Sequence, residues 1–400
     1  MKKILISIFV LLGIVAICLL YRHNKEVSFQ TPSESKIFSE KTKRIEDKEN
    51  SKNKEDEKNP KRVLIYSVGD IIFHQIMYLN TKDGEGNYSF NHMFEDMKDF
   101  FADRLVIGNY ETTSNPNRKW SGYPMFNTPP QAIKALKESG FDVLTTANNH
   151  CMDTGAQGIA TTIEELEKNG LAHTGTFKSI DDTRGIIFEK NGIKIGIIAY
   201  SEMFNGNDCS LKKEQRYMIN PLDKDKIRKD IEDLKGRGAD FIIAYPHFGN
   251  EYQVEPTDSQ KFWAKFLLEE GADIVIGSHP HVPQKCEAFD FNGKEKYVVY
   301  SLGNFISNQN RQSIGKKLTE VGSGIELNLI KDDRGTRLEN FKLNPIYTSR
   351  VRNDKGYFEF RSRDLNKLIE KTEDANMKKS LLELKDIWTQ VVEITNREFD

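Results

Sequence analysis

Residues that can hold a metal ion or move a proton recur along this sequence, each just after a short apolar run. They are carboxylates, amides and imidazoles, a mixture that suits divalent transition metals such as Mn, Fe or Zn better than calcium. Two such ions about 4 Å apart would need roughly this many ligands. The residues are Asp70, Asn109, Glu111, Asn148, Asn149, His150, His247, His279 and His281.

Each of these motifs has a simpler structural interpretation when it is taken alone. Asp70 after a glycine could be a turn or a helix cap. The Asn-Asn-His segment at 148–150 could satisfy backbone groups, and His247 beside a proline is typical of a structural histidine. The His-Pro-His segment at 279–281 is more specific, because the proline restricts the backbone and two imidazoles leave one tight loop. Their shared position after successive apolar runs favours a common site.

The apolar runs read as strands that alternate with helices. Such an alternation predicts an α/β domain, and Asn-Gly pairs at 191–192 and 292–293 predict two hairpins within mixed sheets. In open α/β sheets ligands bind beyond the carboxyl ends of the strands. We expect strands at 62–68, 105–107, 141–146, 241–245, 273–276 and 297–300, and helices at 130–139, 159–169, 223–237 and 259–270.

Six motifs resemble the bacterial capsule biosynthesis protein CapA family, of the poly-γ-glutamate synthesis group. They are GDIIFH, GNYET, ANNHCMDTG, HFGNEY, GADIVIGSHPHVPQ and YSLGNFI, and the resemblance covers about residues 62–345. That family in turn resembles the calcineurin-like metallophosphoesterases. The resemblance therefore implies an α/β fold of the metallophosphatase-like kind, a four-layer sandwich in which two mixed β-sheets are flanked by helices.

The resemblance also implies roles for single residues. His150 would face the substrate as an acid or electrostatic stabiliser, and Asp153 is a possible partner to orient it, so these two are the catalytic candidates. We expect Asn109 and Asn148, which follow the same strands, to contact the substrate. By the resemblance, the metal ligands would be Asp70, Glu111, Asn149, His247, His279 and His281.

The sequence departs from the metallophosphoesterase pattern at three positions. Ile72 stands where the histidine of a D-x-H motif is expected, and His74 lies two residues further on. Glu111 replaces an aspartate. Cys151 replaces the acidic residue that would orient His150, and such a loss loosens the position and tautomer of a histidine. These departures predict that one of two metal positions is weak or absent; a nucleophilic Cys151 is an alternative use of that residue.

A long segment before the 130–139 helix carries cationic and aromatic residues. Long loops often serve as binding lids, and such groups suit a polyanion, although an exposed loop without a ligand explains them equally well. The residues are Arg118, Lys119, Trp120 and Tyr123.

The composition excludes several classes of protein. Lys and Arg number 58 against 60 Asp and Glu, so no basic field points to nucleic acid. With 30% charged and 38% hydrophobic residues the chain is no polytopic membrane protein. Four cysteines in 400 residues exclude a scaffold built on disulfides.

The ends of the chain differ from its middle. Residues 4–21 carry no charge, which predicts an N-terminal transmembrane helix and a membrane anchor at 1–21; a cleaved signal peptide and a lipoprotein signal are the alternatives. Ten basic and nine acidic residues fill 22–60, which predicts a disordered charged tether. We expect a metallophosphatase-like CapA domain at 61–350 and a C-terminal helical extension at 351–400.

Three functions follow from these interpretations. The resemblance implies a protein of the cell membrane, single-pass with the bulk of the chain extracytoplasmic, that assists synthesis or export of poly-γ-glutamate capsule polymer. Its partners would be an anionic polymer and membrane subunits of a polymer synthesis and export complex. The alternatives are a two-metal phosphoesterase acting on an extracellular phosphate ester, and a non-catalytic polymer-binding module. If it is an enzyme, it would be a metal-dependent hydrolase of the metallophosphoesterase type.

Overall fold

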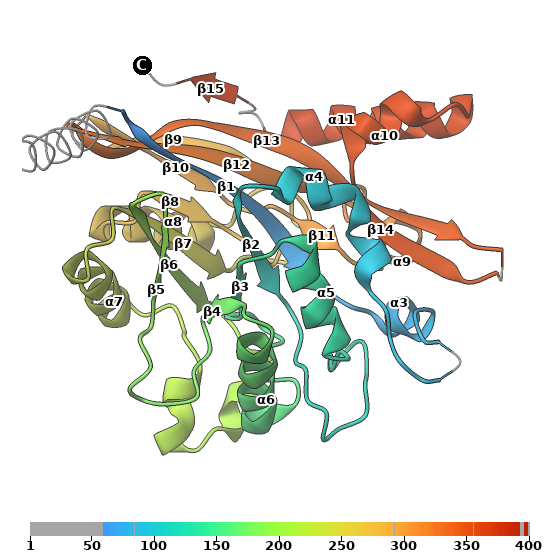
Figure 1. Cartoon of the computed structure of the whole chain (residues 1–400), viewed down its shortest axis with the longest axis horizontal. Helices are drawn as coiled ribbons and strands as arrows, with labels where there is room; N and C mark the ends of the chain where they lie inside the picture. The colour runs from blue at the N-terminus through green and yellow to red at the C-terminus, as the bar shows by residue number, and fades with distance from the viewer. Residues whose placement is uncertain (1–58, 84, 292, 355, 393–395, 399–400) are drawn as a thin grey trace, which may run out of the picture. The chain divides into compact units, whose positions relative to one another are not determined.

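The computed structural model describes residues 59–83, 85–291, 293–354, 356–392 and 396–398 (Figure 1). The expected anchor at 1–21 and almost all of the expected tether at 22–60 lie outside the described residues. The chain from Lys61 to Asp400 forms one compact unit, which is described below. Within the described part of the chain, no helix has the length and apolar character needed to cross a membrane.

Two mixed β-sheets form this unit. The larger has the strand order β14-β13-β12-β1-β2-β3-β4, with β11 beside β1 and β15 beside β13, and the smaller has the order β5-β6-β7-β8-β10-β9. The strands of the larger sheet are β1 Lys61–Ile71, β2 Leu105–Tyr110, β3 Val143–Thr145, β4 Ala172–Thr174, β11 Asn304–Ile306, β12 Val321–Asp332, β13 Gly335–Arg352, β14 Phe358–Asp364 and β15 Asn396–Glu398. Those of the smaller are β5 Ile186–Lys190, β6 Ile193–Ser201, β7 Phe241–His247, β8 Ile274–Ile276, β9 Cys286–Phe291 and β10 Lys294–Val299.

Helices cover the outer faces of both sheets. The helices α5, α6, α7 and α8 follow the four expected helical ranges closely. Gly140, which has a left-handed conformation with φ 111°, ends α5. The α-helices are α3 Gln75–Leu79, α4 Lys98–Phe101, α5 Gln131–Ser139, α6 Gly155–Lys168, α7 Lys224–Gly236, α8 Asp258–Glu270, α9 Arg311–Ile314, α10 Leu365–Lys371 and α11 Ala375–Val392. The 3-10 helices are η1 Asn91–Met93, η2 Glu95–Met97, η3 Asn207–Ser210 and η4 Lys213–Met218.

Three apolar clusters explain this layering. Side chains from both sheets, such as Ile65 of β1 and Ile243 of β7, form one core between the sheets. A second cluster lies between the larger sheet and α3 to α5, and a third between the smaller sheet and α7 and α8. Strands buried on both faces read as continuous apolar runs, as β1 does. The prediction of two mixed sheets flanked by helices is confirmed.

Both predicted hairpins are confirmed. β5 and β6 pair antiparallel around Asn191 and Gly192, whose φ angles of 51° and 72° are those of a tight turn with two left-handed residues. β9 and β10 pair antiparallel in the same way, from Phe291 opposite Lys294.

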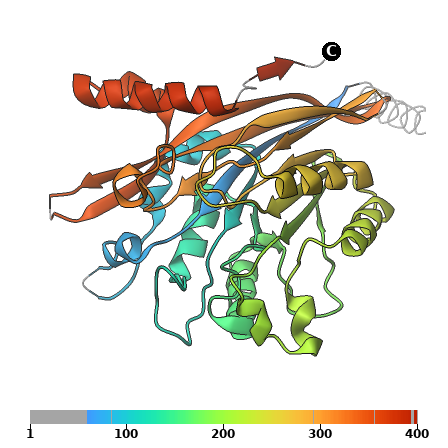
Figure 2. The same cartoon turned by 180° about the vertical axis from the view of Figure 1, so that it is seen from behind.

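The C-terminal part differs from the helical extension expected at 351–400. β13 continues to Arg352, and β14 pairs with it and buries Phe360, so residues up to 364 complete the larger sheet. The helical part of this extension is two helices, α10 and α11, because Asp374 accepts a hydrogen bond from the backbone N–H of Met377 and starts the second one. Both helices lie along β13 in the two views (Figures 1 and 2). Trp388 of α11 belongs to the apolar cluster between the sheets.

Candidate metal centre

Polar side chains from both sheets meet at the carboxyl ends of their strands. In the larger sheet Asp70 lies near the end of β1 and Glu111 directly follows β2; in the smaller sheet His247 ends β7. The two sets are in contact, since 3.0 Å separates Asp70 Oδ2 from His281 Nδ1. The residues therefore converge where a ligand site of an α/β sheet is expected.

The larger sheet contributes oxygen atoms to this cluster. Asp70 and Glu111 are fully buried, and Asn109 holds both. The Nδ2 of Asn109 donates to Asp70 Oδ1 at 2.8 Å and to Glu111 Oε2 at 3.3 Å. A second amide fixes the first, because Asn148 Nδ2 donates to Asn109 Oδ1 at 3.1 Å. Two buried carboxylates held this close together are costly unless a cation or a proton offsets their charge.

The smaller sheet contributes imidazole nitrogens. His247 Nε2 lies 3.1 Å from His279 Nδ1 and 3.6 Å from Glu111 Oε1. His281 Nε2 lies 3.7 Å from the same Glu111 oxygen. The other nitrogen of His247, Nδ1, lies 2.9 Å from Ser278 Oγ. An outer hydrogen bond of this kind sets the tautomer and ring orientation of metal-binding histidines.

One oxygen at the centre of the cluster supports metal binding. Glu111 Oε1 is buried and, among the described residues, has no hydrogen-bond donor. The nearest imidazole nitrogens are too far for good hydrogen bonds, yet ligand atoms about 2.1 Å from one ion lie roughly 3–3.5 Å apart. Two groups of ligating atoms, each within 4.8 Å, share Glu111: one adds Asp70 and His247, the other His279 and His281. This donor set fits a divalent metal ion.

Burial sets the protonation states of the cluster. Burial, and then the neighbouring Asp70, raise the pKa of Glu111 well above its usual value. Burial lowers the pKa of His247 well below its usual value, and burial together with His281 lowers the pKa of His279 to about 3. The imidazoles of His247 and His279 are thus neutral at neutral pH, the form that coordinates a metal.

The backbone of the His-Pro-His loop is held in an unusual conformation. His279 has φ 99° and His281 has φ 57°, values that residues other than glycine seldom adopt. The surrounding contacts must maintain this conformation, and strain of this kind gathers at ligand sites. The backbone N–H of His279 donates to Asp70 Oδ2 at 3.3 Å, which joins the loop to the larger sheet.

Three asparagines occupy different places around the cluster. Asn149 contributes an amide oxygen, Oδ1, 3.0 Å from His247 Nε2, which puts it beside the metal-binding groups. Asn109 and Asn148, which we expect to contact a substrate, are buried, and their amides form hydrogen bonds within the protein. Asn109 donates to the carboxylate of Asp70, and Asn148 donates to Asn109.

His150 and Asp153 form a pair beside the cluster. Their Nδ1 and Oδ2 atoms lie 2.7 Å apart, so Asp153 is placed to orient His150. A turn closes the gap, since the backbone N–H of Asp153 donates to the carbonyl of His150 at 3.2 Å. The structure also places Phe126 here, which the sequence did not single out: its ring lies edge-on to His150 at 4.7 Å, and its N–H donates to Asp153.

Cys151 has the properties of a core residue. It is buried among apolar side chains, and burial raises the pKa of its thiol to about 12. A thiol that stays protonated is a poor nucleophile, which favours a structural role for Cys151 over a nucleophilic one.

The loop before α5 remains a candidate contact surface. Arg118 and Lys119 are exposed, and 77% of Tyr123 is exposed. The base of this loop is ordered by Asn127, whose Nδ2 donates to the carbonyl groups of Asn115 and Lys119. The loop therefore presents cationic and aromatic groups from a fixed base.

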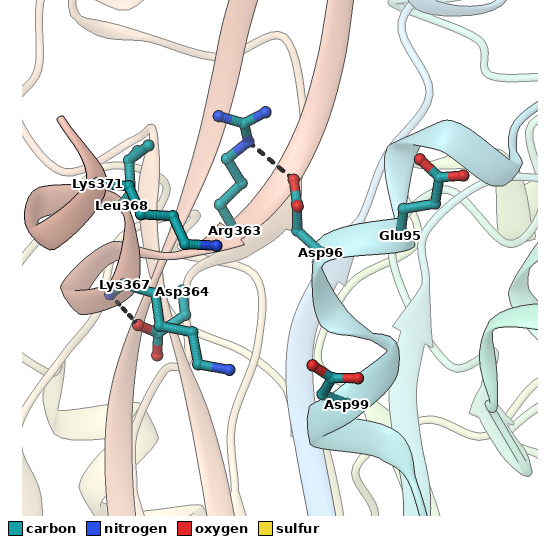
Figure 3. A pocket seen from close by; sticks show the side chains of 8 residues that line it. All are labelled: Glu95, Asp96, Asp99, Arg363, Asp364, Lys367, Leu368 and Lys371. Atoms are coloured by element: carbon teal, nitrogen blue, oxygen red, sulfur yellow. Dashed lines mark hydrogen bonds and ion pairs between the residues drawn. The ribbon is translucent and has the colours of Figure 1, made fainter.

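A hollow of about 300 Å³ between η2, α4 and the start of α10 has a different character (Figure 3). It is lined by acidic and basic side chains, and two of its carboxylates have basic partners. Asp96 lies 2.9 Å from Arg363, and Glu95 lies 3.5 Å from Arg361. Such ion pairs at the surface contrast with the buried and unpartnered oxygen of Glu111.

Comparison with known proteins identifies the family. A family model described as bacterial capsule synthesis protein PGA_cap matches residues 64–309, more than half of the chain. The chain belongs to this family. The PGA biosynthesis protein CapA of Bacillus subtilis is 31% identical over 284 residues, which are 70% of each chain. The capsule biosynthesis protein CapA of Bacillus anthracis is 29% identical over 64% of this chain, and the chain spans 62% of that protein's length.

More distant similarities extend to other proteins. A probable polyglutamine synthesis accessory protein of Mycobacterium tuberculosis is 21% identical over 51% of this chain and 56% of its own length. Among solved structures, the NAD nucleotidase of Haemophilus influenzae has a TM-score of 0.46 at 14% identity, over 82% of this chain and 63% of its own. A calcineurin-like phosphoesterase of Bacillus subtilis has a TM-score of 0.42 at 18% identity, over 72% and 91%.

Proposed function

We propose that this chain is an accessory protein of capsule polymer synthesis or export, that its polymer is poly-γ-glutamate, and that it works through a divalent metal centre of the metallophosphatase type. Family membership supports the role in capsule synthesis. The printed names of two relatives, a capsule biosynthesis protein and a PGA biosynthesis protein, support the polymer. The observation that carries the metal centre is the buried Glu111 oxygen without a donor, which belongs to two groups of ligating atoms.

The ligands would come from both sheets. Asp70 and Glu111 would contribute carboxylate oxygens, Asn149 an amide oxygen, and His247, His279 and His281 imidazole nitrogens. This mixture favours Mn, Fe or Zn. When bound, such an ion would supply Lewis acidity toward a phosphate or carbonyl oxygen.

His150 is the residue of this chain best placed to move a proton. The carboxylate of Asp153 accepts from Nδ1–H, which leaves Nε2 as the atom that exchanges a proton with a bound ligand. Phe126 supports the pair from both ends, with its ring against His150 and its backbone N–H on Asp153. The pair is therefore held in one geometry before any ligand arrives.

A second function is favoured by the sharing of Glu111. Two overlapping ligand groups with a common carboxylate are the arrangement expected for two ions, and a proton-transferring histidine lies beside them. On this alternative the chain is a metal-dependent phosphoesterase that acts on an extracellular phosphate ester. It predicts hydrolysis of simple phosphate esters by the metal-loaded chain.

The location of the protein is part of the same proposal. The uncharged run at 4–21 supports a single membrane-spanning anchor, with the rest of the chain outside the cytoplasm. The partners would be membrane subunits of the synthesis and export complex, together with the anionic polymer itself. The protein should then remain in the membrane fraction and be cleaved from intact cells by added protease.

A polymer assay in the producing bacterium tests the proposal. The chromosomal copy is replaced by the Glu111→Gln variant, and extracellular poly-γ-glutamate is measured against equal amounts of protein. We expect the polymer to fall to the level of a deletion strain. Glu326→Gln is the matched control, because Glu326 lies in the same sheet but pairs with Arg104 away from the centre. Unchanged polymer in the Glu111→Gln strain would contradict the proposal.

A further inference from the structure

A hollow of about 280 Å³ lies at an open edge of β13. The first residue of β12, Val321, pairs with Tyr347, so beyond Tyr347 the strand β13 pairs only with β14 among the described strands. The segment before β12 folds against the edge that β12 leaves free, because the backbone N–H of Thr348 donates to the carbonyl of Glu320 at 2.9 Å. The hollow is lined by residues of this segment and of both strands, Arg350 among them.

Arg350 brings to this hollow a cation that lacks a counter-ion. Its guanidinium carbon lies 3.8 Å from the centre of the Phe358 ring, and its Nε is buried with no hydrogen-bond partner among the described residues. In the same part of the chain, no carboxylate oxygen lies within 4.0 Å of its side-chain nitrogens. A buried polar atom without a partner is costly, and an ion or water that completes its contacts is the usual explanation. The contacts of Arg350 are therefore complete only when an anion occupies the hollow.

The neighbouring arginines differ from Arg350, because they are paired with carboxylates of this chain. The carboxylate in the lining of the hollow, Glu320, is held by Arg311: its Oε1 lies 2.7 Å from Arg311 Nε, and its Oε2 accepts from the Arg311 backbone N–H at 3.0 Å. On β14, Arg363 lies 2.9 Å from Asp96. Both oxygens of Glu320 are thus engaged elsewhere, and the charge of Arg350 stays unpaired.

The backbone of Arg350 provides a second donor at the same edge. Thr348 lies opposite Ser362 of β14, yet its N–H points away from β14 to Glu320, so these two residues are a pair without mutual hydrogen bonds. Pairs with and without hydrogen bonds alternate along an antiparallel ladder. Arg350, two residues further on and opposite Phe360, therefore has its N–H on the open edge as well. One residue thus offers the hollow a main-chain N–H and a guanidinium.

A short series of contacts links the hollow to the proposed metal centre. The backbone N–H of Tyr252 donates at 2.8 Å to the carbonyl of Pro280, between the two histidines of the His-Pro-His loop. Gln309 Nε2 lies 3.2 Å from the hydroxyl oxygen of Tyr252, and the next residue, Asn310, lines the hollow. The hollow is therefore separate from the metal ligands but lies on the segment that contacts their loop.

We propose that this hollow is a second anion-binding site, which takes one carboxylate of the anionic polymer at Arg350. The identity of the polymer rests on the proposed function, whereas the site itself needs no metal. A guanidinium binds a carboxylate through two parallel hydrogen bonds, and its stacking on Phe358 fixes the plane in which it does so. One unpaired cation matches the single charge of a carboxylate better than the nearly double charge of a phosphate group. A polymer held here and at the centre would gain affinity from the two contacts together.

Calorimetric titration of the full-length chain, purified in mild detergent, with a γ-linked glutamate trimer tests the site. We expect Arg350→Gln to weaken binding of the trimer about tenfold, the usual effect of losing hydrogen bonds between charged groups. The loss should appear after chelation of metal as well as with Mn²⁺, and Tm should stay at the wild-type value. Should Arg350→Gln lower Tm, Arg350→Lys takes its place, because lysine keeps the charge but lacks the planar fork.

Arg352→Gln is the matched control for the loss of one positive charge. Arg352 lies on the same strand and its guanidinium carbon is 4.6 Å from the same Phe358 ring, but it is exposed and lies outside the lining of the hollow. It should bind the trimer as wild type does. A trimer with all its carboxylates amidated is the ligand control, and its binding should not depend on Arg350.

The outcomes separate this site from the metal centre. Unchanged affinity in the Arg350 variant, an equal loss in Arg352→Gln, or no binding of the trimer by wild type overturns the site and leaves the metal centre standing. Equal dependence of the amidated trimer on Arg350 overturns the carboxylate as the recognised group. Trimer binding that depends on Arg350 in a chain that retains no metal supports the site and overturns the metal centre of the proposed function.

Discussion

The two sheets contribute different chemistry to one centre. The larger sheet offers carboxylate oxygens from Asp70 and Glu111, at or just after regular strands, and Asn109 holds them by hydrogen bonds. The smaller sheet offers imidazoles, two of them from a loop with positive φ angles at His279 and His281. The carboxylates thus come from regular strands, and two of the three imidazoles come from a loop with a left-handed backbone.

This difference explains why neither sheet alone would bind a metal ion. Two buried carboxylates without a cation would repel one another, and the neutral imidazoles of His247 and His279 would carry no charge to attract one. Glu111 is the residue that links the sets, because both groups of ligating atoms contain it. Changes on each side of the centre should therefore have separable effects.

The largest effect is expected from Glu111→Gln, which removes the shared ligand. Bound metal should fall below about a tenth of the wild-type amount, together with about 3 kcal/mol of metal-linked stability at a hundredfold excess of metal over Kd. Without metal, the variant should be at least as stable as wild type, because the amide replaces a buried oxygen that lacks a donor. Melting curves with and without Mn²⁺ test both expectations: lower stability than wild type with metal, and at least equal stability without it. A Glu111→Gln variant that binds metal normally would contradict the role of Glu111 as the shared ligand.

A change beside the centre should act on turnover and leave the metal in place. Asp153→Asn disturbs the tautomer and orientation of His150, which typically costs 10- to 100-fold in activity, about the effect of losing an outer partner. Hydrolysis of p-nitrophenyl phosphate by the Mn²⁺-loaded chain measures the loss, with metal content determined on the same sample. Wild-type turnover in the variant would contradict the role given to the pair.

Replacing a single histidine ligand should remove about half of the bound metal. His247→Ala affects the group with Asp70, and His281→Ala the group with His279, so each should lower the bound metal to about half. Metal analysis by mass spectrometry, with His92→Ala as a control outside the centre, gives the count. Complete loss of metal in both variants would indicate one shared ion in place of two positions.

The smallest effect is expected on the outer face of the smaller sheet, where α7 packs. Asp230 of α7 accepts a hydrogen bond from Tyr200, and burial raises its pKa to about 6. A raised pKa means that its contribution to stability is present near pH 4 and is lost as the pH rises through about 6. Asp230→Asn should therefore gain about 1 kcal/mol over wild type at pH 7.5 and little at pH 4. Urea unfolding across this range tests it; a constant difference would contradict the assignment.

The sequence predicted those parts of the molecule whose signals are local. Glycines at helix ends, Asn-Gly turns and apolar runs are each made by residues that are close together in the chain. The helices, hairpins and strands expected from these signals are present. The convergence of Asp70 with His281 spans 211 residues, and it could be expected only from the rule that strand ends share an edge.

The other features of the fold and the site depend on contacts between segments far apart in the chain, which no local sequence pattern predicts. β12 alternates buried and half-buried residues from Ile325 to Leu329, which is a strand signal, but its partner β1 lies some 260 residues earlier. The roles of Asn109 and Asn148 followed from the direction of their side chains, which spacing does not provide.

The metal content of the purified full-length chain tests the central claim most directly. The chain is exposed to Mn²⁺, Fe²⁺ or Zn²⁺, dialysed, and analysed by mass spectrometry alongside Glu111→Gln. We expect wild type to retain at least one equivalent of a transition metal after dialysis, and the Glu111→Gln variant to lose it. A wild-type chain that retains none of the three metals, while its melting temperature is unaffected by them, would contradict it.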